Sequence, residues 1–164
     1  KRMSYWNNGK KGEYDFIKLV KPYGGATLVH DTKQQYQDID CKMKSDGRTV
    51  SVKDQYSADK FECFLFEYSQ QRTSDGESIQ GNLQNCQADL YAICSPTKWF
   101  VFDAPKLKEF ILGGTWKKLR TNSNTEKQNR QLKGENSYDR AWSYVISYKD
   151  LRESGALKWE TKRT

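Results

Sequence analysis

Apolar residues at helical spacing mark the two clearest helices of the chain. Residues 9–24 carry an apolar stripe in an otherwise charged segment and include Pro22 near their end, which predicts a helix of about three turns. Residues 105–114 begin with a proline, continue with apolar residues three and four positions apart and finish with two glycines. This combination predicts a second helix.

Alternating or continuous apolar runs predict the strands. The segments are 26–31, 38–44, 49–55, 59–70, 86–95, 98–104 and the first part of 141–159, whose remainder predicts a short helix. Among them, 59–70 is almost continuously apolar, as expected of a central strand. Residues 71–82 and 116–139 have few large aliphatic side chains, so we predict a loop for the first and a long loop or a mobile arm for the second. This order of elements predicts an α/β (α+β) domain, with a central mixed β-sheet flanked by helices.

Residues 38–55 form a predicted hairpin with an unusual polar face. If Asp46 and Gly47 are the two central residues of the turn, three polar pairs face each other: Lys42 with Ser51, Asp40 with Lys53, and Asp38 with Gln55. Alternation places the apolar side chains on the opposite, core-facing side: Ile39, Cys41, Met43, Val50 and Val52. A carboxylate directly opposite a lysine is either a solvated cross-strand ion pair or part of a chemical site.

The positive charge of the chain is concentrated in its last third. The 164 residues carry a formal net charge of +7, and residues 105–164 hold 14 Lys/Arg against 7 Asp/Glu, whereas residues 1–104 are balanced. A modestly basic surface is common, but this asymmetry favours a face that binds a polyanion such as nucleic acid. Six side chains are candidates for phosphate contacts: Lys117, Lys118, Arg120, Lys127, Arg130 and Lys133. Trp116 and Tyr138 either stack on bases or belong to the core.

The cysteines, the histidine and the hydropathy exclude several classes of site. Four cysteines occur without a C-x-x-C pair, which argues against structural zinc, and Cys41 and Cys63 lie in apolar runs, which favours reduced thiols in a cytoplasmic protein. His30 is the sole histidine, and nothing near it supports a catalytic triad, so we expect it in a loop or at a strand edge. No apolar run approaches the roughly 20 residues that span a bilayer, so we expect no membrane partner.

An acidic residue near a strand end, a hairpin and then x-Val-x-Lys on the next strand form the skeleton of the PD-(D/E)xK nuclease superfamily. The chain resembles the small phage and bacterial nuclease-like members over roughly residues 6–112. "NNGKKGEYDFIKLV" resembles their opening helix, which supplies an acid, here Glu13. "QDIDCKM" resembles the strand with the metal-binding aspartate, here Asp40, and "VSVKDQ" resembles the E-x-K strand, here ending in Lys53. The later "FLFEYSQ", "QADLYAI" and "KWFVFDAPKLKEFI" also resemble segments of these proteins.

The resemblance implies a single nuclease-like domain over residues 1–164, with a restriction-endonuclease-like core at about 6–112 and a basic extension at about 113–164. It implies metal-dependent hydrolysis of phosphodiester bonds in nucleic acid, with double-stranded or branched DNA as the expected substrate. The catalytic residues it implies are Asp40, Lys53, Glu13 and Gln55. The ligands it implies for Mg²⁺, for which Mn²⁺ can substitute, are Asp40, Asp38, Glu67 and Glu13, with help from the Val52 carbonyl.

The chain departs from the superfamily pattern at Ser51, which replaces the E-x-K glutamate. A hydroxyl is a poor ligand for Mg²⁺, so one of Glu13, Asp38 or Glu67 would have to complete the cation site. Two other functions therefore stay open: a catalytically inactive nucleic-acid-binding protein on the same scaffold, and a protein-interaction or inhibitor module. Superfamily members often act as dimers, so a homodimer is a further expectation, although no apolar stripe identifies an interface. The expected location is the cytoplasm of a bacterial or phage-infected cell.

Overall fold

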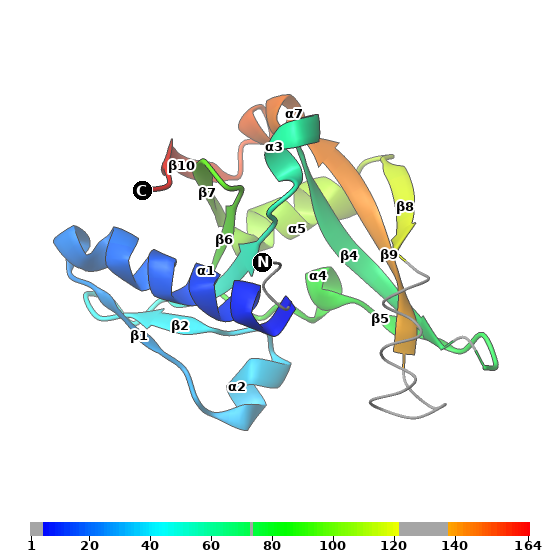
Figure 1. Ribbon diagram of the computed structural model, residues 1–164, viewed down its shortest axis with the longest axis horizontal. Coiled ribbons are helices and arrows are strands. Elements are labelled where there is room, and N and C mark those ends of the chain that lie inside the picture. The colour runs from blue at the N-terminus through cyan, green and yellow to red at the C-terminus, as the bar shows by residue number, and fades with distance from the viewer. Residues whose placement is uncertain (1–4, 73, 122–137) are drawn as a thin grey trace.

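A computed structural model describes residues 5–72, 74–121 and 138–164, which form two β-sheets with helices packed around them (Figure 1). The predicted mixed α+β class is confirmed. The larger sheet has the order β1-β2-β3-β6-β7-β10. Its strands are β1 (Ala26–Leu28), β2 (Cys41–Met43), β3 (Thr49–Asp54), β6 (Leu90–Cys94), β7 (Lys98–Asp103) and β10 (Leu157–Lys162). It is mixed because β3 and β6 run parallel, whereas its other neighbours are antiparallel.

A second, antiparallel sheet has the order β5-β4-β9-β8. Its strands are β5 (Ser78–Gln80), β4 (Cys63–Arg72), β9 (Tyr138–Ser147) and β8 (Lys117–Thr121). Figure 1 shows these strands to one side of the larger sheet. Strands from the predicted extension at 113–164 thus belong to both sheets: β10 pairs with β7 in the larger sheet, and β9 pairs with β4 in the second sheet.

The amino-terminal helix α1 (Tyr5–Val20) covers one face of the larger sheet. Its Phe16 and Val20 are buried in a cluster with side chains of β2, β3, β6 and β7, and the Phe16 ring lies 5.7 Å from that of Trp99. The helix passes into a 3-10 turn, η1 (Lys21–Tyr23), which contains Pro22. Gly24, with φ of 101°, then turns the chain into β1. A glycine suits this position because other residues are strained at such an angle.

The other face of the larger sheet packs against α5 (Ala104–Leu112) and the inner end of the second sheet. Phe64 on β4 and Phe100 on β7 meet edge to face at 5.2 Å in this larger cluster. The Asp103 carboxylate accepts a hydrogen bond from the Lys106 N–H and caps α5. Four shorter helices complete the described residues: α2 (Thr32–Tyr36), α3 (Ala58–Phe61), α4 (Asn82–Asn85) and α7 (Tyr148–Arg152).

The predicted hairpin exists, but its register differs from the prediction by two residues. Lys42 pairs with Thr49 rather than with Ser51, because the turn is wider than two residues. Its Met43 N–H donates to the Arg48 carbonyl, and the Gly47 N–H donates to the Met43 carbonyl. A shift of two keeps each strand's inward and outward positions, so Lys53 stays on the expected face.

Several other predicted boundaries are wrong. Residues 59–70 begin with α3, and Glu62 at φ 49° separates it from β4, which belongs to the second sheet and continues to Arg72. The predicted loop 71–82 includes β5 and the start of α4, and the predicted loop or arm at 116–139 contains β8 and the start of β9. Ile39 packs in the larger cluster and not beside Cys41, because Asp38 adopts φ 59° and turns the chain before β2.

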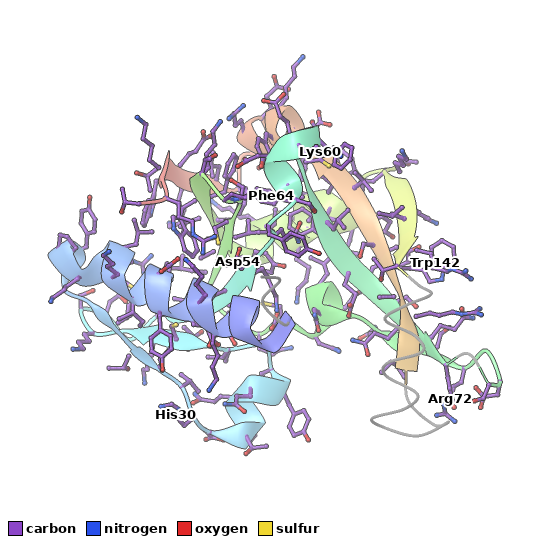
Figure 2. All side chains as sticks on the ribbon, in the orientation of Figure 1. His30, Asp54, Lys60, Phe64, Arg72 and Trp142 are labelled. Atoms are coloured by element: carbon purple, nitrogen blue, oxygen red, sulfur yellow. The ribbon has the colours of Figure 1, made fainter. Side chains whose placement is uncertain are left out.

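The remaining expectations concern thiols, histidine and membranes. All four cysteines are free; Cys63 is partly exposed, whereas Cys41, Cys86 and Cys94 are buried. His30 is exposed in the loop that follows β1 (Figure 2). Across the described ranges, none of the helices combines the length and the apolar character needed to cross a membrane.

Candidate active site

A cavity of about 650 Å³ lies between α1, the end of β3 and one face of the second sheet. Five of the residues implied by the superfamily resemblance line it, although they come from separate parts of the chain: Glu13, Asp40, Lys53, Gln55 and Glu67. Asp38, the sixth, does not line the cavity but contacts Lys53. The fold therefore gathers the predicted residues around a single space.

Gly12 allows α1 to approach β3 closely enough to bring Glu13 to the cavity. A Cβ atom at position 12 would lie 3.0 Å from the Cβ of Asp54, which is tighter than almost all real contacts of this kind. Figure 2 labels Asp54, the residue after Lys53, beside α1. The glycine before Glu13 thus has a packing role: it sets the distance between the helix and the strand that carries the lysine.

Glu13 and Asp40 form a carboxyl pair at the cavity. Their side chains are hydrogen-bonded to each other, and the Val52 N–H donates to Oδ2 of Asp40 at 2.7 Å, which fixes that carboxyl group. Burial and the nearby Asp40 charge raise the pKa of Glu13 to about 7. Burial also raises the pKa of Asp40, against the opposing effects of Lys53 and the Val52 N–H. At neutral pH and without a cation, the pair therefore tends to share a proton.

This pair predicts a pH-dependent stability for the metal-free protein. A carboxyl whose folded-state pKa is about 7, against 4.5 unfolded, binds more protons when folded, so stability falls as pH rises from about 4.5 to 7 and is constant above. Glu13 is partly exposed, and solvent screening reduces the cost to about 1 kcal/mol, or roughly 3 °C in Tm. Thermal melts in EDTA across this range measure it. Glu13→Gln should flatten the profile, and an unchanged slope in that variant would contradict the assignment.

Asp38, and not Asp40, is the direct partner of Lys53. The Lys53 Nζ lies 2.5 Å from Oδ1 of Asp38, and the Ser51 hydroxyl donates to Oδ2 of Asp38 at 2.9 Å. Burial lowers the pKa of Lys53, but the Asp38 and Asp40 charges outweigh it, and the net effect is a raised pKa. The lysine is therefore a fixed cation. Ser51 is fully buried, and its hydroxyl orients the Asp38 carboxylate.

Gln55 and Glu67 also have defined partners. The Gln55 amide nitrogen donates to the Leu65 carbonyl at 2.6 Å, and its oxygen accepts from the Leu65 N–H at 2.8 Å. Gln55 thereby joins the end of β3 to β4. A carboxylate oxygen of Glu67 accepts a hydrogen bond from the Gln70 amide at 2.6 Å. Glu67 therefore lies in the cavity wall with one oxygen bound to a neighbouring residue.

Tyr91 is a cavity residue that the sequence analysis missed. It is 4% exposed, its ring packs on Phe66 at 5.9 Å, and within the described ranges its hydroxyl has no hydrogen-bond partner. Burial raises its pKa well above the usual value, so the hydroxyl remains a donor. Tyr91 lies beside Ser51 through the parallel pairing of β3 with β6. That pairing is the signal that would have identified it, and a single sequence does not reveal it.

The basic candidates divide between the two faces of the second sheet. Thr121 lines the cavity, and by alternation Lys117 shares its face, whereas Lys118 and Arg120 lie on the opposite face. Lys127, Arg130 and Lys133 lie outside the described residues, as does the side chain of Tyr138. Trp116 packs on Phe110, and its indole N–H donates to the Ile111 carbonyl, so it belongs to the core.

Within residues 5–72, 74–121 and 138–164, no three carboxylate, thiolate or imidazole side chains are grouped as a ready-made metal site. Comparisons with protein-family models, with curated proteins and with solved structures give no match for this chain.

Proposed function

We propose that this chain is a metal-dependent endonuclease of the PD-(D/E)xK type, which hydrolyses phosphodiester bonds in nucleic acid, with DNA as its substrate. The observation that carries the proposal is the single cavity lined by Glu13, Asp40, Lys53, Gln55 and Glu67. The superfamily resemblance implies each of these residues, although they lie far apart in the sequence. A nuclease needs carboxylates and a positively charged side chain at one phosphate, and this cavity holds carboxylates together with the ammonium group of Lys53.

The carboxyl pair fits Mg²⁺ or Mn²⁺. Mg²⁺ is a hard cation that keeps several waters and is often bound by only one or two carboxylates together with substrate phosphates. Glu13 and Asp40 would hold it, because both carboxyls are partly desolvated and repel each other when ionised. Glu67 lies in the same wall as a further oxygen donor. When bound, the cation supplies positive charge to the scissile phosphate and lowers the pKa of water to give a nucleophile.

Of the remaining site residues, some contact the phosphate directly and others position the side chains that contact it. Lys53 places a positive charge at the cavity, where negative charge accumulates as water adds to phosphorus and a P–O bond breaks. Asp38 and Ser51 position that lysine. The Tyr91 hydroxyl is a neutral donor to a phosphate oxygen. Gln55 holds the cavity wall through Leu65, which differs from the catalytic role that the resemblance implies.

The partner proposed for the basic residues is DNA, in the cytoplasm, where free thiols such as those of the four cysteines persist. Lys117 is exposed on the cavity face of β8 and is suited to a phosphate next to the cleaved one. A homodimer stays part of the proposal only as a property common in the superfamily.

Titration of the metal-free protein with Mn²⁺ in a calorimeter tests the proposed cation site. We expect one site, and a loss of affinity of at least tenfold in Asp40→Asn, because one of two carboxylate ligands is removed. Binding should release protons near pH 6, since the carboxyl pair holds one there. Plasmid, single-stranded DNA and RNA incubated with Mg²⁺ or with EDTA give the second readout. Identical results with Mg²⁺ and EDTA on all three nucleic acids would refute the nuclease assignment.

One observation favours a second candidate, a catalytically inactive nucleic-acid-binding protein. In the part of the chain that the structure describes, the acids are divided between two partners: Asp38 is bound to Lys53, and Glu13 to Asp40, so no three converge. The same titration separates the candidates, because the inactive binder would take up no Mn²⁺ at Asp40 and would still bind nucleic acid.

A further inference from the structure

On the side of the second sheet opposite the cavity, Phe66 and Ile146 pack into the core, and the part of this side that follows them carries aromatic and basic side chains together. We call it the outer face and define it as Tyr68, Lys118, Arg120, Trp142 and Tyr144. Lys118 is directly opposite Tyr144 in the β8–β9 ladder, and Arg120 is directly opposite Trp142, so these four side chains share one side of the sheet. Figure 2 shows Trp142 at the margin of the molecule, across the second sheet from Asp54.

Two aromatic rings of the outer face are already stacked. The rings of Tyr68 and Tyr144 lie 4.1 Å apart and are inclined by 19°, and Lys118 Nζ lies 5.8 Å from the centre of the Tyr68 ring. Tyr68 reaches this position because β4 has a bulge there: Glu67 pairs with Ser143 and Ser69 with Trp142, which leaves Tyr68 as the extra residue. The bulge turns the tyrosine toward β9 and extends the aromatic surface.

Trp142 is the least explained side chain of this face. It is partly exposed, and in the described ranges it makes no hydrogen bond, ring stack or cation–π contact, unlike Trp99, Trp116 and Trp159. Tyr144 on the same face packs against the core, whereas Trp142 lies partly exposed next to it, and such a tryptophan usually has a partner for its ring or for its N–H. Its neighbours on the face are cations, so a partner that combines flat rings with negative charge fits both features.

We propose that the outer face binds an unpaired strand of DNA, with bases stacked on Trp142 and Tyr68 and phosphates held by Lys118 and Arg120. Paired bases expose only their edges, so an aromatic surface is suited to unpaired bases, which expose a ring that can stack. The inference rests on the proposed function and narrows its substrate: the cavity and the outer face lie on opposite sides of the second sheet, so one substrate that occupies both has a strand that leaves the site of cleavage. Branched or tailed DNA has this form, whereas a blunt duplex does not.

Fluorescence anisotropy with a labelled 20-nucleotide oligothymidylate tests the outer face. Trp142→Ala should weaken binding on the order of tenfold, the usual loss for one stacked base. Lys118→Ala, at an exposed position, should lower the slope of log K against log salt by about 0.7. Matched controls are Tyr36→Ala and Lys33→Ala on α2, an exposed tyrosine and lysine remote from β8, which should bind as wild type. Wild-type affinity in both Trp142→Ala and Lys118→Ala would overturn the proposal.

Competitors and a catalytic variant complete the test. A 20-base-pair blunt duplex should bind more weakly than oligothymidylate and should be insensitive to Trp142→Ala. Polyglutamate that competes as well as oligothymidylate would overturn the proposal, because it would show recognition of charge without bases. Oligouridylate that binds tenfold more tightly would overturn the choice of DNA. Asp40→Asn, which removes a proposed metal ligand, is assayed for cleavage in parallel and should lose it. If cleavage fails in every assay while Trp142→Ala still weakens binding, the nuclease assignment fails and the outer face stands.

Discussion

Lys53→Met is expected to lower the rate of Mg²⁺-dependent DNA cleavage by about 10²–10³-fold, with little change in DNA affinity. The methionine keeps the length of the side chain and removes the charge, which in the wild type is fixed at the cavity by Asp38 at 2.5 Å. A preorganised cation that meets charge formed in the transition state contributes about 3–4 kcal/mol in comparable sites. Single-turnover cleavage of a labelled substrate at saturating protein measures the chemical step apart from binding.

The matched control for Lys53→Met is Lys42→Met, an exposed lysine on the neighbouring strand that lies outside the cavity. It should cleave at the wild-type rate. Asp38→Asn keeps the Lys53 charge but removes its anchor, and it should lower the lysine pKa and move the alkaline limb of the rate profile to lower pH. If Lys53→Met and Lys42→Met cleave equally fast, Lys53 is not a catalytic residue and the Asp38 contact is a structural ion pair.

Arg163→Met is expected to destabilise the protein by about 3 kcal/mol, or roughly 6–12 °C in Tm. The Arg163 side chain is 8% exposed, and its guanidinium contacts Asp15 on α1 at 2.7 Å and Asp54 on β3 at 2.9 Å. Removal leaves Asp54 without its cation beside Asp15, which keeps only the exposed Lys11, and this costs more than the loss of an exposed pair. Thermal or urea unfolding at pH 7 measures it.

The pH dependence of the Arg163→Met difference has a defined sign. Burial raises the Asp15 pKa, but hydrogen bonds from Lys11 and Arg163 outweigh it, and the net pKa is lowered. A lowered carboxyl pKa gives stability that is present at neutral pH and lost as pH falls through the folded-state pKa, so the gap between wild type and variant should narrow in acid. Lys162→Met, an exposed change at the last residue of β10 and next to Arg163, is the control and should leave Tm within about 1 °C. A gap that stays constant from pH 7 to pH 3 would contradict the ion-pair explanation.

The sequence was informative wherever one strand or helix carried its own pattern. Alternation around Cys41 and Val52 was enough to place Lys53 on the side of the sheet opposite these apolar side chains, and this placement was kept despite the wrong register because the error was two residues. The helix before Pro22 was also predictable, because its apolar stripe lies within one segment of the chain. Gly12 and Glu13 were recognised through resemblance alone, and the packing reason for the glycine emerged with the 3.0 Å approach to Asp54.

Features that depend on pairing between distant segments could not be predicted. β4 and β9 pair along ten residues, and neither pattern reveals that they form a sheet separate from β3. β8 escaped detection because Lys117, Lys118 and Arg120 give it little apolar character, and as an edge strand it needs little. Consequently, the division of the basic side chains between two faces, and the position of Tyr91 beside Ser51, became visible only with the strand order.

The side-chain amide of Gln55 makes the two hydrogen bonds that a main-chain peptide group of a neighbouring strand would make. Its amide donates to and accepts from Leu65 in the manner of a neighbouring main chain, at a point where the ladders of the two sheets do not meet. The hydrogen-bonded connection between the end of β3 and β4 is thus made by one side chain instead of a row of backbone bonds, in addition to the packing of Phe64 on Phe100. A substitution at position 55 would therefore remove both bonds and alter the spacing of these strands at the cavity, while the backbone ladders of the two sheets stay intact.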